Sequence, residues 1–379
     1  MSKRSIFEEV GTEGPAEKAA PTPGLIDRGQ DRGRGAVRIW LLVIGLLVVA
    51  MIAVGGLTRL TDSGLSITEW KPVTGALPPM SAEGWDSEFA KYRESPQYEN
   101  MNTGMTLPEF KSIYWWEWSH RQLGRTIGLV WALGFAVFVA TKRMPAGFAK
   151  RTLVLGALGG LQGAIGWWMV SSGLVGDMTS VASYRLAVHL GLAFAILGLT
   201  AWTMLLLSRS SHELMVARRG KEPKLFSMAT GLMHFAMLQV LLGALVAGID
   251  AGRTFTDWPL MAGGIFPLDM WDLSPWWKNF FENPGTVQFM HRLSGYLLVI
   301  FGFIVWRRGR RSGNLNTRMA FNIVGGLLLW QLVLGITTVL HAAPLPLAIA
   351  HQFTAILLWI AIIRARFFAQ YPKAQSVRG

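Results

Sequence analysis

Four of the seven histidines occupy matched positions along the chain. His120 and His291 each open an apolar stretch, and His189 and His351 each lie a few residues inside a later one. An ionisable side chain within an apolar stretch is a functional candidate by default. Facing imidazoles on neighbouring helices are a common way to hold heme iron. The sequence therefore predicts two iron sites, one between His120 and His189 and the other between His291 and His351.

The histidine pattern alone leaves a core role and a zinc site open. A single neutral histidine in a membrane helix is more often a hydrogen-bonded core residue, although matched pairs make that role less suitable. Zinc usually takes three or four ligands, often including cysteine or carboxylate, and the chain has no cysteine. Among the remaining histidines, His212 is expected to be solvated in a loop and His234 to be a hydrogen-bonded core residue. His341 is expected at the membrane interface.

The residues before His120 and His291 differ in one chemical respect. Glu117 lies three residues before His120, and Gln288 lies three residues before His291. Each therefore shares a helix face with its histidine, one turn away. A carboxylate can move a proton or balance positive charge, whereas an amide cannot. The alternative is that Glu117 is an ordinary acid at a helix start.

Arginine directly follows both of these histidines, as Arg121 and Arg292. Heme propionates are anionic and prefer the wet edge of a membrane, where a guanidinium fork suits a carboxylate. The alternative is that these long side chains only extend to the interface.

Eight apolar stretches can position these residues. A membrane-spanning helix needs about 20 mostly apolar residues, and apolar residues make up 51% of this chain against 16% charged. We divide the last, continuous stretch at residues 342–346, because two prolines and a turn break a helix. We therefore expect an all-α integral membrane protein. The predicted spans are residues 38–57, 119–141, 152–171, 185–207, 226–248, 287–306, 319–341 and 345–363.

Lysine and arginine gather in alternate loops, which predicts the orientation. Short basic clusters beside apolar stretches are typical of cytoplasmic loops, so the net charge of +13 does not indicate a nucleic-acid partner. The opposite loops are acidic or mixed, and the long loop at residues 58–118 should form a small external cap. Both termini are expected to be cytoplasmic. The clusters are Lys142, Arg143, Lys150 and Arg151; Arg218, Arg219, Lys221 and Lys224; Arg307, Arg308, Arg310, Arg311 and Arg318; and Arg364, Arg366 and Lys373.

The chain repeats itself as two sets of four spans. Residues 68–72 after the first span are matched by residues 256–259 after the fifth. Because four is even, both sets enter the membrane the same way. We expect eight transmembrane helices as two tandem four-helix bundles related by a pseudo-two-fold axis along the membrane normal. Further matches are Gln162 and Gly166 in the third span with Gln331 and Gly335 in the seventh.

This repeat predicts the domain boundaries. Residues 1–36 are polar and are expected to form a disordered cytoplasmic tail, and their acidic residues argue against a mitochondrial transit peptide. We therefore expect the inner membrane of a bacterial cell. The first bundle is predicted at residues 37–210 with its external loop, the second bundle at residues 211–366, and a cytoplasmic tail at residues 367–379.

Several of these segments together resemble the heme A synthase family of bacteria and mitochondria, over about residues 38–365. The resemblance rests on residues 55–66, on Glu117-Trp118-Ser119-His120-Arg121 with Leu123-Gly124-Arg125, on His189, on Phe289-Met290-His291-Arg292 and on His351-Gln352. The family oxidises a methyl group of heme O to the formyl group of heme A, which terminal oxidases use. Some members carry a cysteine pair in the first external loop, and this chain has none.

The resemblance implies a role for each half of the chain. The first half would bind the substrate heme, and the second would hold a resident heme b between two histidines and pass electrons. Glu117 matches the essential acid of the family and would accept a proton or stabilise positive charge. Oxygen would be added in two rounds, and loss of water would give the aldehyde. The implied residues are His120, His189, Arg121 and Arg125 for the substrate heme, and His291, His351 and Arg292 for heme b.

Two other classes of protein fit parts of this pattern. A diheme b-type membrane cytochrome would only carry electrons, and the difference between Glu117 and Gln288 argues against it. A transporter with parallel repeats should have its site near the membrane midplane in broken helices, whereas the four matched histidines lie at or near the starts of their apolar stretches. Besides heme O as substrate and membrane lipid, the expected partners are an unidentified electron donor, heme O synthase and oxidase assembly factors. A homo-oligomer is compatible with the sequence.

Overall fold

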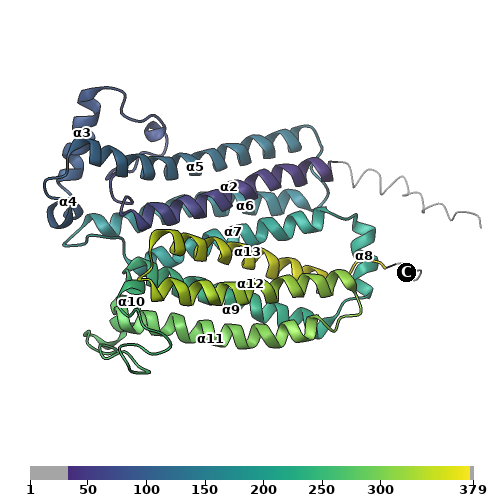
Figure 1. The fold of residues 1–379 in the computed structure, drawn as a ribbon. Coiled ribbons are helices and arrows are strands. Elements are labelled where there is room, and N and C mark those ends of the chain that lie inside the picture. Colours follow the sequence, from purple (N-terminus) through teal and green to yellow (C-terminus); the bar gives the residue numbers. More distant parts are fainter. Residues whose placement is uncertain (1–32, 376–379) are drawn as a thin grey trace, which may run out of the picture.

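The computed structural model describes residues 33–375, which form an all-α structure. Within that range eight helices are long and apolar enough to cross a membrane, which confirms the expected number of spans. They run roughly alongside one another (Figure 1). They are α2 Arg34–Leu60, α5 Leu107–Ala140, α6 Phe148–Val170, α7 Ser183–Leu207, α9 Pro223–Gly248, α11 Pro284–Gly309, α12 Leu315–Leu340 and α13 Leu345–Gln370.

Shorter helices lie in the connections between the spans. Most of the expected tail at residues 1–36 lies outside the described residues, and α2 begins near its end, at Arg34. At the other end of the chain, α13 continues to Gln370, into the segment expected as a tail. The shorter helices are η1 Thr74–Ala76, α3 Ala82–Arg93, α4 Pro96–Met101, η2 Ser171–Leu174, α8 Ser211–Arg219, η3 Ala251–Arg253, η4 Trp276–Lys278 and α10 Asn279–Glu282.

The last apolar stretch divides at the expected turn. α12 stops at Leu340, and Ala342 and Ala343 both have positive φ. Pro344 follows as the N-cap residue of α13. Proline lacks the backbone N–H that an uninterrupted helix would use, so α12 and α13 form two antiparallel spans.

α5 begins well before its expected start near residue 119. Thr106 and Glu109 form a capping box, and Pro108 lies in the first turn. Both features favour a helix start at this point. The helix has 34 residues, whereas a span needs about 20. Its first turns therefore belong to the cap formed by the segment between α2 and α5, and its later turns belong to the bundle of spans.

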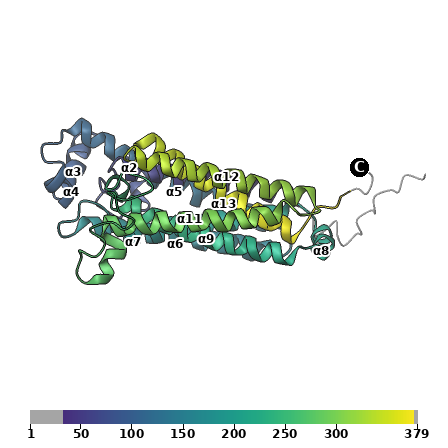
Figure 2. The same cartoon turned by 60° about the horizontal axis from the view of Figure 1, so that its bottom comes forward.

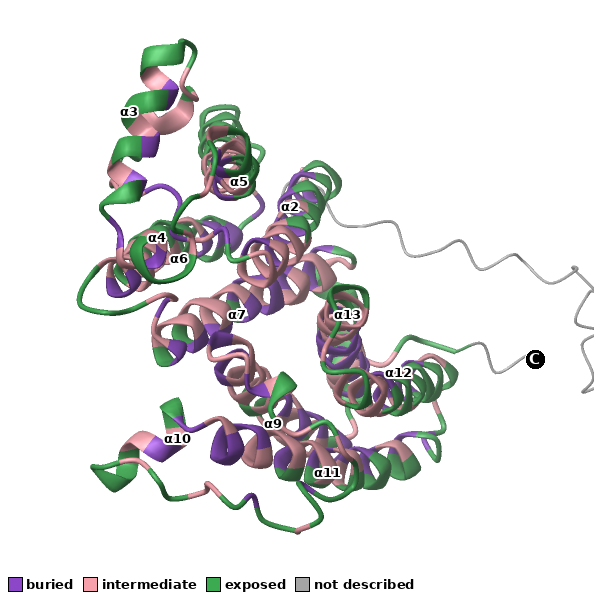
Figure 3. Cartoon of the chain, turned by 60° about the vertical axis from the view of Figure 1, so that its left-hand side comes forward, coloured by how far each residue is buried: buried purple, intermediate pink, exposed green. Residues whose placement is uncertain are grey.

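The eight long helices make the same set of contacts twice. α2 packs against α5 and α7, and α6 packs against the same two helices. In the second set, α9 packs against α11 and α13, and α12 packs against the same two. α7 and α13 join the sets, and the Trp359 indole donates to the Phe194 carbonyl at 2.8 Å. Seen from one end, buried residues lie between neighbouring helices and exposed residues lie on outward faces (Figure 3).

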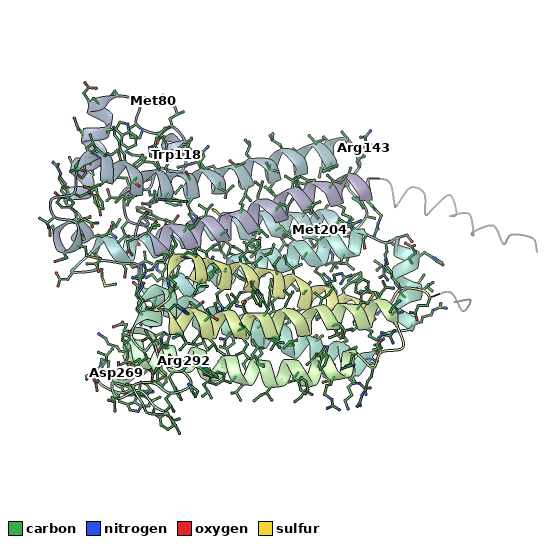
Figure 4. All side chains as sticks on the ribbon, in the orientation of Figure 1. Met80, Trp118, Arg143, Met204, Asp269 and Arg292 are labelled. Atoms are coloured by element: carbon green, nitrogen blue, oxygen red, sulfur yellow. The ribbon has the colours of Figure 1, made fainter. Side chains whose placement is uncertain are left out.

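The connections separate to the two ends of the molecule. α3, α4 and α10 lie at one end, and α8 lies at the other (Figures 1 and 2). Met80, Trp118 and Arg292 lie toward the first end, whereas Arg143 from a basic cluster lies at the opposite end (Figure 4). The start of α2 is also at this opposite end, where Arg34 donates to the Leu206 carbonyl at 2.7 Å.

The segment between α2 and α5 forms a cap around aromatic side chains. Phe89 of α3 stacks on Phe110 of α5, with ring centroids 4.8 Å apart. Tyr92 also stacks on Phe110 at 5.3 Å, and Trp85 meets Tyr114 edge-on at 5.0 Å. All five side chains are buried. Burial of large aromatic rings is a strong stabilising contribution, so aromatic packing holds the cap to α5 in this cysteine-free chain.

A charged cluster supports the cap on one side. Lys91 donates to Glu69 at 2.6 Å and to Glu88 at 2.8 Å, and Lys71 donates to Glu69 at 2.7 Å. Hydrogen bonds from Lys71 and Lys91 lower the pKa of Glu69 from its ordinary 4.5. Burial disfavours the charged form of Lys91, but its hydrogen bonds outweigh burial and raise its pKa above the ordinary 10.5. The cluster ties α3 to the segment that follows α2.

Candidate functional site

The helices bring the matched histidines together in two pairs. The rings of His291 on α11 and His351 on α13 have centroids 6.5 Å apart, with planes inclined at 78°. His120 on α5 and His189 on α7 lie near each other in the first set of helices. Two metal–nitrogen bonds of about 2 Å each place the bonded nitrogens about 4 Å apart. The separation of the His291 and His351 rings therefore suits one metal ion held between two imidazoles.

A glycine on a neighbouring helix lies against each of the four imidazoles. A Cβ built on any of these glycines would lie only 2.9–3.1 Å from the ring Cε1 atom. The absence of a side chain is therefore what allows each ring to lie against a helix backbone. We call these four contacts the glycine seats. They are Gly55 of α2 with His120, Gly166 of α6 with His189, Gly243 of α9 with His291 and Gly335 of α12 with His351.

Three of the glycine seats also have a glutamine four residues before the glycine, on the same helix face. Each glutamine Nε2 donates to the backbone carbonyl of the histidine at 2.9–3.0 Å. It also lies 3.1–3.4 Å from at least one ring nitrogen. The repeat pattern in the sequence did not point to Gln239 and Gly243, although they have the same spacing as the other two. The pairs are Gln162 with His189, Gln239 with His291 and Gln331 with His351.

The residues around each histidine pair fit a heme better than a zinc ion. In residues 33–375, no three side chains of histidine, cysteine, aspartate or glutamate gather where they could hold a metal ion. Zinc usually requires three or four such ligands. The Nδ1 atoms of His120 and His351 are buried and lack a partner among the described residues. Two imidazoles on facing helices are a donor set that suits the axial positions of heme iron.

Glu117 is held by donors on both of its carboxylate oxygens. Its Oε2 accepts from the Ser66 hydroxyl at 2.8 Å and from the Ile67 backbone N–H at 2.7 Å. Its Oε1 accepts from Arg121 Nε at 3.1 Å and Nη2 at 2.6 Å. The side chain is 3% exposed. Glu117 is therefore not an ordinary acid at an exposed helix start, and its surroundings are built for an acceptor on both oxygens.

Gln288 has a different partner in the other half. It is also buried, and its Nε2 donates to the Phe255 carbonyl at 3.0 Å. Its Oε1 accepts from Arg292 at 3.3 Å. The loop above Glu117 offers a backbone N–H from Ile67, whereas the loop above Gln288 offers a carbonyl. The change from acid to amide therefore goes together with a change in the loop group that each side chain meets.

The three arginines predicted as site residues hold the loops at one end of the bundle onto the helices. Each guanidinium donates to two or more backbone carbonyls, so these side chains do more than extend to an interface. Arg292 also has a buried Nε without a partner among the described residues. The carbonyl acceptors are Ile67 and Glu69 for Arg121, Lys71 and Pro72 for Arg125, and Phe255, Asp257 and Leu260 for Arg292.

The other three histidines lie outside the two pairs. The expectation that His234 is a hydrogen-bonded core residue is wrong, because His234 is exposed on α9. It shares an outward helix face with Leu238, which is 47% exposed. His212 is exposed on α8, in keeping with a solvated position. His341 is exposed at the end of α12, where its Nδ1 lies 2.8 Å from the Thr337 carbonyl.

Two adjacent glycines of α2 contact both halves of the molecule. Gly55 forms the glycine seat of His120. A Cβ built on Gly56 would overlap the Gln352 amide, whose Nε2 donates to the Ile52 carbonyl at 2.6 Å. Gln352 directly follows His351 of the other pair. A single turn of α2 therefore contacts His120 of one pair and the residue that follows His351 of the other.

Comparison with known proteins adds a family match and close relatives. The model of the COX15-CtaA family, described as cytochrome oxidase assembly protein, matches residues 38–363. A heme A synthase of Ruegeria sp. is 62% identical over 381 residues and covers 100% of both chains. A heme A synthase of Paracoccus denitrificans is 60% identical over 379 residues, covering 100% of this chain and 99% of its own length.

Proposed function

The chain belongs to the COX15-CtaA family of cytochrome oxidase assembly proteins, and from that membership we infer that it is a heme A synthase. Relatives of that name align with its full length at 60–62% identity. The activity is the conversion of heme O to heme A, an oxidation of a porphyrin methyl group to a formyl group. The protein is a multi-pass membrane protein with eight candidate spans in residues 33–375.

The presence of one histidine pair in each set of four helices is the observation that supports two heme sites. Each set of four helices has one histidine pair, two glycine seats and the same pattern of helix contacts. These similarities support two tandem four-helix bundles related by a pseudo-two-fold axis along the membrane normal. In this arrangement each bundle, residues 37–210 and residues 211–366, holds one heme between two histidines.

The two sites have different roles. His120 and His189 bind the substrate heme, beside Glu117, and His291 and His351 hold heme b. Bound heme b supplies one-electron redox chemistry. The protein positions both groups. Support for this division comes from Glu117, whose matched residue in the other half is an amide.

Glu117 is the proposed catalytic residue of the substrate half. It lies one helical turn from His120, where a buried carboxylate can accept a proton or balance positive charge as the methyl group is oxidised. Ser66, Ile67 and Arg121 fix its two oxygens in place. Fixed partners reduce the reorganisation that a developing charge would otherwise require.

The three arginines bind heme propionates in this proposal. Arg121 and Arg125 lie at the substrate half, and Arg292 lies at the heme b half. Their donation to loop carbonyls holds the guanidinium groups near the outer end of the helices. The partnerless Nε of Arg292 is a buried donor that a propionate oxygen would satisfy.

The orientation and location follow from the basic loops. We place the protein in the inner membrane of a bacterial cell. Both termini, including the residues that follow α13, lie in the cytoplasm, and the cap lies on the opposite side of the membrane. Heme O is the substrate partner. An electron donor, heme O synthase and oxidase assembly factors are further proposed partners.

Analysis of the extracted pigment tests this function directly. The protein is purified from cells with and without heme O supply, and its hemes are separated by chromatography. Heme b together with heme O or heme A, and formation of heme A only when heme O is supplied, are expected. Heme b alone under both conditions would instead indicate a cytochrome that only carries electrons, and the absence of any heme would indicate a transporter.

A further inference from the structure

One of the four glycine seats differs from the others. Met51 stands four residues before Gly55, where the matched helices carry glutamine. Its Cε atom lies 3.1 Å from a Cβ built on Gly124, one turn after His120 on α5. In the other half, Gln239 Nε2 lies 3.2 Å from a Cβ built on the matched Gly295. The methionine methyl group therefore fills the place that an amide fills in the second half.

This replacement removes a donor from the surroundings of His120. Gln239 donates to the His291 carbonyl at 3.0 Å and lies 3.1 and 3.4 Å from the two ring nitrogens. A thioether has no N–H to donate. His351 resembles His120 in having a partnerless Nδ1, but its carbonyl still accepts from Gln331 at 3.0 Å. Within residues 33–375, His120 is the one histidine of the four without a bond from glutamine.

Such a bond matters because groups around a metal ligand fix its orientation. Loss of a group that orients a ligating histidine typically costs about 10–100-fold in metal affinity, and the glutamine orients His291 through its backbone carbonyl. Methionine is also flexible, with three rotatable bonds, and adapts to changes in its neighbours. His120 is therefore the least firmly fixed of the four ligands proposed for iron.

We propose that Met51 makes His120 the releasable ligand, so that the heme beside α2 and α5 exchanges while the other is retained. Gln239 has the opposite effect on His291 and helps to retain heme b. This inference rests on the proposed function, because a synthase must admit heme O and release heme A at one site only. Met51 is thus a positioning residue that distinguishes a substrate site from a cofactor site.

Reciprocal substitution of the two residues tests the inference. The full-length protein is loaded with heme O and heme b, and excess apomyoglobin captures the hemes that it releases. Chromatography of the captured hemes gives a separate release rate for each. Met51→Gln is expected to slow release of heme O about tenfold or more, and Gln239→Met to speed release of heme b by a similar factor. Met51→Leu, which also lacks a donor, should release heme O at close to the wild-type rate.

The outcomes separate this inference from the proposed function. Unchanged heme O release in Met51→Gln, with the heme b absorption intact as a sign of folding, would overturn the role of Met51. If that variant does not fold, unchanged heme b release in Gln239→Met overturns the inference, because it shows that the glutamine bond does not retain a heme. A wild-type protein that forms heme A with either negative result leaves the synthase assignment standing. A wild-type protein that binds heme b but never heme O removes the proposed function and the inference with it.

Discussion

At the scale of single residues, Glu117 and Gln288 show how a loop determines which side chain is suitable. The partners of Glu117 include the Ile67 N–H and the Arg121 guanidinium, both of which only donate. An amide at position 117 must turn its own NH₂ group toward one of these donors. Gln288 avoids this conflict because the Phe255 carbonyl faces it. The second half therefore does not show that an amide is harmless in the first.

Glu117→Gln is expected to lose most heme A formation while keeping its four proposed iron ligands in place. The amide cannot take a proton or balance a developing cation, and loss of a placed acid–base group typically costs about 10²–10⁴-fold in rate. Heme O, or a partly oxidised alcohol form, should accumulate. Chromatography of hemes extracted from the variant and the wild type measures this.

Ser66→Ala provides the control for loop anchoring. It removes one donor to Glu117 but leaves the carboxylate and its contacts with Ile67 and Arg121. If the charge of Glu117 is what matters, this variant should retain much more heme A formation than Glu117→Gln. Equal losses in the two variants would reduce Glu117 to an anchor of the loop.

The histidine pairs give a second prediction at this scale. His291→Ala or His351→Ala should lose heme b, because one axial ligand cannot hold a low-spin heme of this type well. His120→Ala or His189→Ala should mainly disturb the substrate heme. Absorption spectra of the purified variants measure both effects.

His234→Ala is the matched control, since His234 is exposed on α9 outside both pairs. Its spectrum should be close to that of the wild type. The pairing is wrong if His234→Ala bleaches a heme and His351→Ala does not.

At the scale of elements, the cap depends on buried aromatic rings and on the charges around Lys91. Glu69 has a lowered pKa, so its contribution to cap stability is fully present above pH 4.5, the ordinary pKa of a glutamate. That contribution decreases below pH 4.5 and is lost once the pH falls through the lowered pKa of Glu69. Lys91 has a raised pKa, so Lys91 itself stays charged at pH values below 10.5, and the acid response follows its carboxylate partner Glu69. The cap should therefore loosen on the acid side.

Lys91→Met should loosen α3 at neutral pH and make its acid response smaller. The substitution removes the bonds to Glu69 and Glu88, and exposed ion pairs of this kind contribute about 0–1 kcal/mol each. Hydrogen exchange of the α3 amides between pH 3 and 8, corrected for intrinsic rates, is the measurement. Glu94→Gln is the control, because Glu94 takes part in none of the ion pairs found among residues 33–375. An acid response of the same size in Lys91→Met and wild type would contradict this account.

Several elements could be read from the sequence, and the misses have clear physical reasons. The split between α12 and α13 was predictable because prolines and a turn interrupt the helix pattern. The early start of α5 was also encoded, in the capping box of Thr106 and Glu109, but those turns are not apolar enough to register as a span. The prediction for His234 is wrong because the apolar sequence of a span does not reveal which face of α9 packs inward.

At the scale of the whole molecule, the basic clusters predict orientation. Reporter fusions after Ala146, Ser312 and Gly379 should all read as cytoplasmic, and a fusion near Glu88 should read as external. The physical reason is retention of lysine and arginine in short loops on the cytoplasmic side. An external C-terminal reporter would overturn the proposed orientation.

The repeat made the histidine pairs predictable, but their surroundings depend on tertiary contacts. His120, His189, His291 and His351 could be matched by their order in the chain. The partners of Glu117 could not, because Ser66 and Ile67 reach it from a loop about 50 positions earlier. The spacing of glutamine and glycine was visible in the sequence, and its meaning emerged only when each pair was found against a histidine.

The adjacent glycines of α2 have a thermodynamic consequence. Gly55 lies against His120, and Gly56 lies against Gln352, the neighbour of His351. A rotation or shift of this turn would alter both contacts at once, so binding at one site that moved the turn would change the free energy of ligation at the other. Linkage of this kind is reciprocal. A heme that enters the first bundle and tightens the second must itself be bound more tightly when the second is filled.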